Sequence, residues 1–290
     1  MAINFKHTIR LTKSLSVVAG LFFGSWVQAA PDPDFHIYLL LGQSNMEGAA
    51  PIEPQDMTTH PRVMVLQDAD CASSTPYGQW RVASPPLIRC GGSNFGLGPG
   101  DTFGQLMADA APDNVTVGLV GGAYGGAKIE YFLKDCASYE ACTPPWGPIK
   151  GAPDNGNSGG YKWIVELAQK AQQKGVIKGI IFHQGESNSG QDTWPARVNQ
   201  LISDLRKDLS LKAEEVPFIA GELPYTGCCS GHNSLVAKLP EIVANGHVVS
   251  ADGGLADKGD RLHWNSAAVR EMGRRYAEKM QALQNQAPAQ

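Results

Sequence analysis

Two short polar segments near opposite ends of the chain carry residues that together can perform acyl transfer. Ser44 stands in the segment GQSN, directly after the apolar residues 37 to 41, and Asp260 and His263 stand in DKGDRLHWNSAA. The offset of three residues lets the Asp260 carboxylate bond the imidazole Nδ1 of His263, which fixes the tautomer and leaves Nε2 free as a general base for a serine hydroxyl. The structural alternative makes Ser44 a helix N-cap and Asp260 a ligand of its own loop backbone.

Two further segments contain groups that can stabilise a developing negative charge. In HQGES, Gln184 offers a neutral amide N–H to an oxyanion, and Glu186 is an ionisable group that either helps to orient the base or ties loops together. In GGAYGG, residues 121 to 126, consecutive glycines let the backbone approach a ligand closely and expose N–H groups. The alternative for these glycines is a simple turn, and the lysine and hydroxyl residue of a phosphate-binding P-loop are missing.

Apolar runs and helical patterns alternate along the chain and predict the elements that position these residues. The runs are rich in Val, Ile and Leu, which is typical of strands covered on both faces. They span residues 35 to 41, 62 to 66, 115 to 120, 176 to 182, 216 to 221 and 247 to 250, and the helical patterns span 101 to 110, 161 to 174, 194 to 209, 234 to 244 and 266 to 284. The alternation predicts an α/β fold with a mainly parallel sheet, whose functional residues gather at the carboxyl ends of the strands.

Two long Gly- and Pro-rich insertions, at about 67 to 100 and 134 to 160, interrupt this alternation and contain four of the six cysteines. Long irregular loops in a compact domain are usually functional or disordered. Because cysteines can staple such loops, we expect the two insertions to be ordered and to wall a cleft.

All the cysteines follow residue 30, and an even number of cysteines in an exported chain indicates disulfides. The candidates are Cys71, Cys90, Cys136, Cys142, Cys228 and Cys229. The first two and the next two would each close a local loop, and a bond between the last two, which are neighbours in sequence, would stiffen a turn. The alternatives are crossed pairing with other loops or two free thiols. No Cys-x-x-Cys pair with a histidine at a ligand offset is present, which argues against a zinc site.

The first 30 residues have the pattern of a secretory signal peptide. Lys6, Arg10 and Lys13 form a basic region, residues 15 to 27 are mostly apolar, and Val-Gln-Ala at 27 to 29 matches a small-residue cleavage site. A membrane anchor is the alternative, but glycine and polar residues leave the run short of the roughly 20 apolar residues that a span requires. We therefore expect residues 31 to 290 to form one domain that is secreted or periplasmic.

The net charge of the mature chain argues against some classes of partner. Removing the three basic residues of the signal peptide from the total of 24 leaves 21 basic against 28 acidic residues, a net charge of −7. This balance gives no electrostatic footprint for nucleic acid, and no run of like charges indicates a membrane-binding patch. We expect neither nucleic acid nor, after signal cleavage, a membrane as a partner.

The polar segments occur together in a known family. The segments IYLLLGQSNMEG, GLGPGDTFGQLMAD, GGAYGGAKIEYF, HQGES and DRLHWN resemble the sialate O-acetylesterase and acetylxylan esterase group, carbohydrate esterase family six, of the SGNH-hydrolase superfamily. The resemblance spans residues from about 35 to 275. It implies a three-layer α/β/α sandwich of the SGNH-hydrolase, flavodoxin-like type, without metal or cofactor.

The resemblance also implies roles for individual residues. Ser44 is the implied nucleophile, His263 the base and Asp260 the residue that orients the base. The implied oxyanion hole combines backbone N–H groups with one side-chain amide, from Ser44, Gly125, Gly126 and Gln184. The implied activity is removal of O-acetyl groups from carbohydrate through an acetyl-serine intermediate.

The substrate is predicted less sharply than the chemistry. Export and an acidic net charge favour acetylated xylan or a related hemicellulose, and O-acetylated sialic acid is the alternative. Gln43 and Trp264, next to the nucleophile and the base, are expected substrate contacts, since aromatic faces support the apolar faces of sugars. A secreted carbohydrate-binding protein without catalysis and a lipase-like esterase are the other hypotheses. No oligomeric state is predicted.

Overall fold

A seven-stranded sheet forms the centre of the protein, and six of its strands are parallel. The computed structural model describes residues 1–2, 30–71, 75–90 and 96–286. The sheet order is β3-β2-β4-β1-β5-β6-β7, and only β3 runs antiparallel to its neighbour. The strands are β1 (Phe35–Gly42), β2 (Val63–Leu66), β3 (Trp80–Val82), β4 (Thr116–Ala123), β5 (Val176–His183), β6 (Phe218–Gly221) and β7 (Gly246–Val249).

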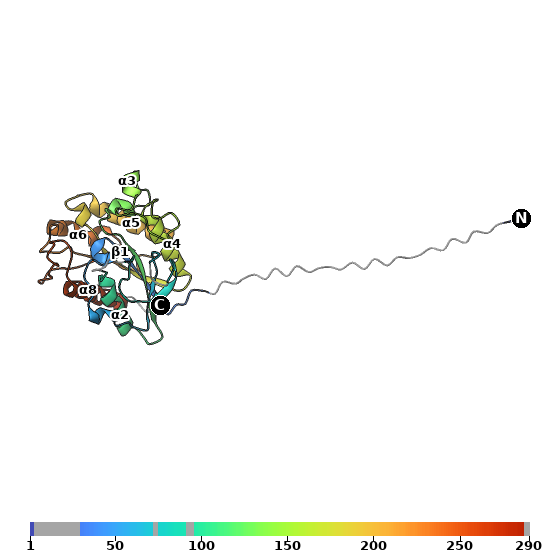
Figure 1. Ribbon diagram of the computed structural model, residues 1–290, viewed down its shortest axis with the longest axis horizontal. Coiled ribbons are helices and arrows are strands. Elements are labelled where there is room, and N and C mark those ends of the chain that lie inside the picture. Colours follow the sequence, from blue (N-terminus) through green and yellow to red (C-terminus); the bar gives the residue numbers. More distant parts are fainter. Residues whose placement is uncertain (3–29, 72–74, 91–95, 287–290) are drawn as a thin grey trace.

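Strand β1 lies at the middle of the sheet and is covered on both faces. Its alternate residues Ile37 and Leu39 belong to one apolar core, and Tyr38 and Leu40 belong to a second core on the opposite face. Helices α4 (Gly160–Gln172) and α5 (Trp194–Asp208) cover the first face, and α2 (Pro99–Ala110) and α8 (Ser266–Gln286) cover the second. Figure 1 shows these pairs on either side of β1. The three-layer α/β fold is confirmed.

The remaining helices are short. They are α1 (Ser44–Glu47), α3 (Tyr139–Cys142), α6 (Asn233–Val236) and α7 (Leu239–Ile242), with 3-10 turns η1 (Pro54–Met57), η2 (Ile129–Phe132), η3 (Glu186–Asn188) and η4 (Ser230–His232). The single helix expected at 234 to 244 is therefore wrong. Pro240 stands in the first turn of α7, and because proline lacks an N–H and clashes with the preceding turn, one continuous helix cannot form through it. All six predicted strands are present, whereas β3, inside the first insertion, was not predicted.

The cysteines pair locally. Disulfides join Cys71 to Cys90, Cys136 to Cys142 and Cys228 to Cys229, so the local pairing is confirmed and the crossed pairings are wrong. The two insertions contact each other through a hydrogen bond from the N–H of Asp70 to the carbonyl of Lys150, 2.8 Å long. The described parts of both insertions lie on the same side of the molecule, since residues from both line one cavity.

The predicted signal peptide lies almost wholly outside the described residues, since the structure describes only positions 1, 2 and 30 of that segment. Within the described ranges, no helix combines the length and the apolar character needed to cross a membrane.

Candidate active site

Ser44 lies where β1 ends and α1 begins, at the carboxyl edge of the sheet. Gly42 has φ +143°, and a Cβ there would lie 2.0 Å from the carbonyl oxygen of His183 on β5, so only glycine lets the two strands approach so closely. The N–H of Gln43 donates to the same carbonyl at 2.9 Å. Gln43 is the N-cap of α1, and no side chain caps that helix. The N-cap hypothesis for Ser44 is therefore wrong.

The hydroxyl of Ser44 instead faces His263, which in turn contacts Asp260. Oγ of Ser44 lies 2.9 Å from Nε2 of His263, and Nδ1 of His263 lies 2.7 Å from Oδ2 of Asp260. Because a carboxylate only accepts, Nδ1 carries the proton and Nε2 is left to accept the serine hydroxyl. Partial burial by itself raises the pKa of Asp260, but hydrogen bonds from the N–H groups of His263 and Leu262 and from the imidazole lower it to about 2. Asp260 is therefore ionised at neutral pH.

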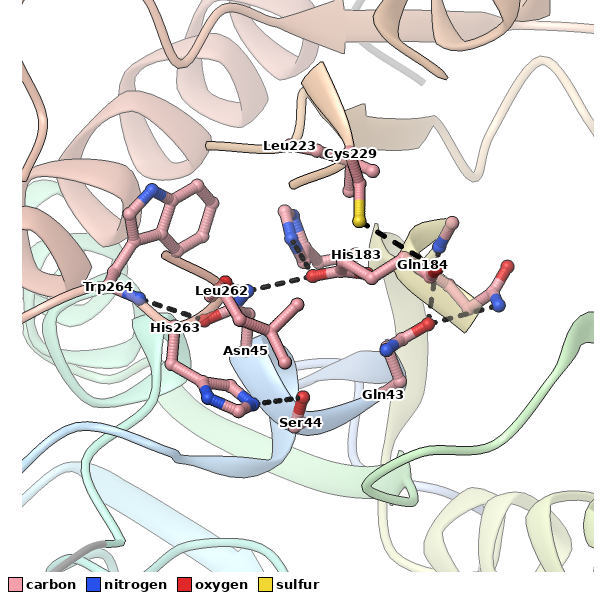
Figure 2. Close-up of polar contacts among 12 residues, drawn as sticks. Gln43, Ser44, Asn45, His183, Gln184, Leu223, Cys229, Leu262, His263 and Trp264 are labelled. Atoms are coloured by element: carbon pink, nitrogen blue, oxygen red, sulfur yellow. Dashed lines mark hydrogen bonds and ion pairs between the residues drawn. The ribbon is translucent and has the colours of Figure 1, made fainter. Parts of the chain in front are cut away.

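The side chain of Asn45 holds both flanks of His263. Its Nδ2 donates to the carbonyl of Leu262 at 3.1 Å, and its Oδ1 accepts from the N–H of Trp264 at 3.2 Å. Asn45 follows the serine directly and is fully buried. Figure 2 shows this amide between the nucleophile and the loop that carries the imidazole. One buried side chain thus helps to set the distance between Ser44 and His263.

Glu186 fixes Asn45 and does not touch His263. Its Oε1 accepts from Nδ2 of Asn45 at 2.7 Å and lies 3.1 Å from Nε2 of His183, inside a site where both side chains are almost completely buried. Burial by itself raises the pKa of Glu186, but the neighbouring His183 and the bond from Asn45 lower it below its ordinary value. Of the two hypotheses for this carboxylate, the loop-tying one fits: Glu186 acts on the base only through Asn45.

The prediction that Gln184 donates to an oxyanion does not agree with its contacts. The side chain is 1 % exposed, and Nε2 donates to Oδ1 of Asn188 (2.6 Å), Oε1 of Gln43 (3.1 Å) and the carbonyl of Ala127 (3.3 Å). Its Oε1 accepts from the indole of Trp194 at 2.5 Å. Both amide hydrogens are therefore used beneath the site, and the residue joins β5 to the segments around it.

The two expected substrate contacts are also buried. Gln43 is 2 % exposed, and its Oε1 accepts from the N–H groups of Gly185 (3.4 Å) and Ser187 (3.2 Å) as well as from Gln184. Trp264 has no exposed surface, and its indole packs on His183 with 4.5 Å between ring centroids. The prediction for Trp264 is wrong, because the indole turns into the core under α8 instead of following its neighbour His263 into the cleft.

Of the predicted glycine donors, Gly125 lies against the nucleophile but already has an acceptor. A Cβ on Gly125 would lie 3.7 Å from Cβ of Ser44, and its N–H donates to Oε2 of Glu47 at 2.5 Å. The other carboxylate oxygen of Glu47 pairs with Arg89 at 2.9 Å. Burial raises the pKa of Glu47, and Arg89 opposes that rise. The next residue, Gly126, is exposed, with φ +73°.

Ser44 and His263 open into a cavity of about 500 Å³. Both insertions line it, the first with Arg89 and the second with Trp146 and Lys150, and Lys258 approaches from the loop of the base. This volume lies in the range of roughly 300 to 1,000 Å³ that is usual for small-molecule sites. Among the described residues, no group of three His, Cys, Asp or Glu side chains is arranged to hold a metal ion.

Sequence reasoning missed three residues that shape this site. Asn45 and Glu47 stand inside the quoted GQSNMEG segment, and their polar side chains in a short buried turn after the serine were the available signal. Arg89 had no signal, because it reaches the cleft through an irregular insertion where it has φ +51°.

Comparison with known proteins agrees with the fold and the geometry. A model of the family described as carbohydrate esterase, sialic acid-specific acetylesterase, matches residues 34–282. A probable carbohydrate esterase of Arabidopsis thaliana is 25% identical over 259 residues, which cover 84% of this chain and 89% of the relative.

Two solved structures share the overall fold. The X-ray structure of the Arabidopsis thaliana protein superposes with a TM-score of 0.68 at 23% identity and covers 87% of this chain and 99% of that one. The crystal structure of NanS gives a TM-score of 0.65 at 17% identity and covers 87% and 98%. The architecture is thus similar to theirs over almost their full length.

Proposed function

The chain belongs to the sialic acid-specific acetylesterase family of carbohydrate esterases, and from that premise we propose that it is a serine esterase that removes O-acetyl groups from carbohydrate. The observation that carries the proposal is the continuous line of contacts from Ser44 through His263 to Asp260. A protein that only binds sugar needs none of these contacts.

The chemistry is a two-step acyl transfer. Ser44 Oγ attacks the acetyl carbonyl while Nε2 of His263 takes its proton, and the same proton then passes to the sugar oxygen as it leaves. Asp260 stays ionised and stabilises the imidazolium that forms between these transfers. In the second step Nε2 of His263 takes a proton from a water molecule, whose oxygen attacks the acetyl carbonyl of the acetyl-serine. The bond to Oγ breaks, acetate leaves, and the proton passes from His263 to Oγ of Ser44.

The negative charge of the tetrahedral intermediate is stabilised by backbone N–H groups beside the nucleophile. The N–H of Ser44 lies in the first turn of α1, where no helical acceptor is available. The second donor is the N–H of Gly125, whose Cβ position lies 3.7 Å from Cβ of Ser44, once the substrate carbonyl displaces the carboxylate of Glu47. Each such donor contributes about 10²-fold or more to the rate.

Acetylated xylan or a related hemicellulose is the first candidate substrate, supported by the acidic net charge, which suits an uncharged polymer. An O-acetylated sialic acid is the second candidate, and the cationic side chains that line the cavity favour it: Arg89, Lys150 and Lys258. Arg89 is already paired with Glu47, and Nζ of Lys258 donates to the carbonyl of Ala49 at 2.9 Å. Lys150 is exposed and is the cation best placed to meet a sugar carboxylate.

The compartment we propose is the periplasm or the exterior of the cell. Three disulfides support this, because such bonds persist in oxidising environments. The predicted signal peptide is consistent with the same route.

The test compares acetate release by the mature protein and by Ser44→Ala, using acetylated xylan, an O-acetylated sialic acid and a small acetyl ester. We expect the wild-type protein to hydrolyse the small ester and at least one sugar ester, and kcat to fall by about 10⁴-fold or more in the variant. A wild-type protein that hydrolyses none of the three, or a variant with full activity, contradicts the proposal.

A further inference from the structure

A second cavity adjoins the one that contains Ser44. It has a volume of about 400 Å³ and lies between η2, α3 and the segment that follows α3. Gly125 lines the first cavity and Gly126 the second; likewise Trp146 lines the first and Pro145 the second. The linings of the two cavities therefore meet at two short pieces of chain, 125 to 126 and 145 to 146, which together are called the ridge.

Trp146 stands on this ridge with its indole in solvent. The residue is 75 % exposed, and a Cβ on Gly126 would lie 2.8 Å from its Nε1, so the ring edge rests against the glycine backbone. A single exposed hydrophobic residue is common and by itself indicates nothing. What distinguishes Trp146 is that its exposed ring borders the cavity of the proposed nucleophile and has a second cavity next to it.

The backbone around this indole is fixed before any ligand arrives. Oη of Tyr124, at the end of β4, donates to the carbonyl of Gly147 at 2.7 Å, and the N–H of Gly147 donates to the carbonyl of Pro144 at 3.3 Å. The disulfide between Cys136 and Cys142 closes the insertion on its other side, and the N–H of Gly159 donates to the carbonyl of Cys142. With its backbone held in this way, Trp146 loses little backbone entropy when a ligand binds its ring.

The second cavity has the mixed character of a sugar site. Polar side chains and the ring of Tyr131 line it together; the polar ones are Lys128, Glu130, Ser138, Glu140 and Thr143. Lys128 and Glu140 are exposed, so they can exchange water for sugar hydroxyls. A pyranose ring has one apolar face for an aromatic side chain and hydroxyls at its edge for such groups.

We infer that Trp146 is the platform of a second sugar subsite, so that the substrate is an acetylated oligosaccharide or polysaccharide and not a free monosaccharide. The acetylated unit occupies the cavity at Ser44, the chain crosses the ridge over the indole, and a neighbouring unit enters the second cavity. This inference rests on the proposed function and names the substrate class of the same site.

The test measures kcat/KM for a small acetyl ester, an acetylated monosaccharide and an acetylated xylo-oligosaccharide. For Trp146→Ala we expect the oligosaccharide value to fall about 10-fold further than the small-ester value, the size expected for loss of one aromatic contact, and Trp146→Phe to recover part of that loss. Tyr139→Ala is the matched control, because Tyr139 is an exposed aromatic residue of the same insertion that lines neither cavity. It should behave like the wild-type protein on all three substrates.

A second measurement does not depend on turnover. In Ser44→Ala, an unacetylated xylo-oligosaccharide should quench tryptophan fluorescence on titration, and Ser44→Ala with Trp146→Ala should lose that quenching. If the wild-type protein hydrolyses the small ester but Trp146→Ala lowers all three kcat/KM values by the same factor, or none, the subsite is wrong and the proposed function stands. If the wild-type protein hydrolyses no ester, the proposed function fails instead.

Discussion

The nucleophile and the base of this site are held by two very different kinds of structure. Ser44 follows β1, which pairs residue by residue with β4 along its whole length and with β5 on the other side. His263 lies in a loop without regular secondary structure, tied by an isolated bridge between Asp257 and Trp264 and by single hydrogen bonds. One of these is the bond from the N–H of Cys228 to the carbonyl of Arg261, 2.8 Å long.

This difference indicates that activity depends on the stability of the fold at the nucleophile, and much less at the base. Moving Ser44 requires breaking the central strand pairs, so its position is lost only when the fold is lost. Moving His263 requires breaking a few local bonds, each with a net value of about 1 kcal/mol or somewhat more. The loop of the base is therefore the region where a substitution can remove activity and leave a folded protein.

The largest effect within that loop is expected for Asp260→Asn. The asparagine oxygen can still accept the N–H groups of Leu262 and His263, but its amide donates to Nδ1 and forces the proton onto Nε2. We expect kcat on a small acetyl ester to fall by about 10³- to 10⁴-fold in a protein that still folds, with a modest loss of stability at neutral pH because the ionic contact is gone. A variant that retains activity would show that His263 does not need this carboxylate.

The same substitution gives a signature in the pH dependence of stability. The pKa of Asp260 is about 2 in the folded protein and about 3.9 in an unfolded chain. Because the folded-state pKa is the lower one, the stabilisation that ionised Asp260 contributes is complete above about pH 4 and is lost as the pH falls through 2. The difference in unfolding free energy between the wild-type protein and Asp260→Asn should therefore shrink between pH 4 and pH 2. A constant difference over this range contradicts the ionic contact.

A smaller effect is expected for Asn45→Ala, which removes the bonds on both flanks of the base. We expect kcat to fall by about 10- to 100-fold, because displacements of the order of an ångström cost that much, while KM changes less. Serine labelling by an organophosphonate should slow in parallel.

The matched control is Asn233→Ala. Asn233 is also buried and also clamps backbone, with its side chain bonded to both the N–H and the carbonyl of Leu223. Both variants should lose about 1 to 3 kcal/mol of stability, but only the change at Asn45 should lower kcat strongly. Equal losses of kcat would mean that general loosening, and not the placement of His263, is responsible.

The smallest effect is expected for the double variant Cys228→Ser with Cys229→Ser. A bond between neighbours removes little chain entropy, so the unfolding free energy should hardly change, whereas Cys136→Ser with Cys142→Ser should lose about 2 kcal/mol. The disulfide stiffens the turn that positions the backbone N–H of Cys228 against the carbonyl of Arg261, in the loop of the base. Serine keeps this N–H but frees the turn, so the first variant should still lower kcat on a small ester a few-fold. The double change at Cys136 and Cys142 should affect kcat less than the double change at Cys228 and Cys229. A larger loss of kcat at Cys136 and Cys142 would contradict the role of the Cys228–Cys229 bond.

Most of the fold was predictable because it follows from local patterns. Continuous apolar runs predicted the six parallel strands, and their place in the order of the chain predicted which side chains meet at the carboxyl edge. The helix at 234 to 244 failed where Pro240 overrode the apolar spacing. Strand β3 is only three residues long and partly exposed, so its pattern was too short to detect.

Within the site, the sequence also indicated the three residues of the proposed triad. It predicted the wrong side chains to border the cleft, because the sequence of a segment does not show which of its side chains face solvent in the folded protein. Gln184 and Trp264 both stand beside polar residues in sequence, but the chain turns their side chains into the core. Among the tryptophans of the described residues, Trp146, in a segment with little pattern, is the one whose ring is mostly in solvent.

The sequence by itself determined the alternation of strands and helices and the chemistry that Ser44, Asp260 and His263 can perform, because each of these depends on residue type and short spacing. It left the pairing of the cysteines open, and the structure decided it. Only the tertiary structure decided which amides were already bonded, which carboxylate contacts the base and which aromatic ring faces the cleft. Those outcomes depend on which distant segments come within hydrogen-bond reach. Asn45 and Leu262 are 217 residues apart in sequence and 3.1 Å apart in the folded protein.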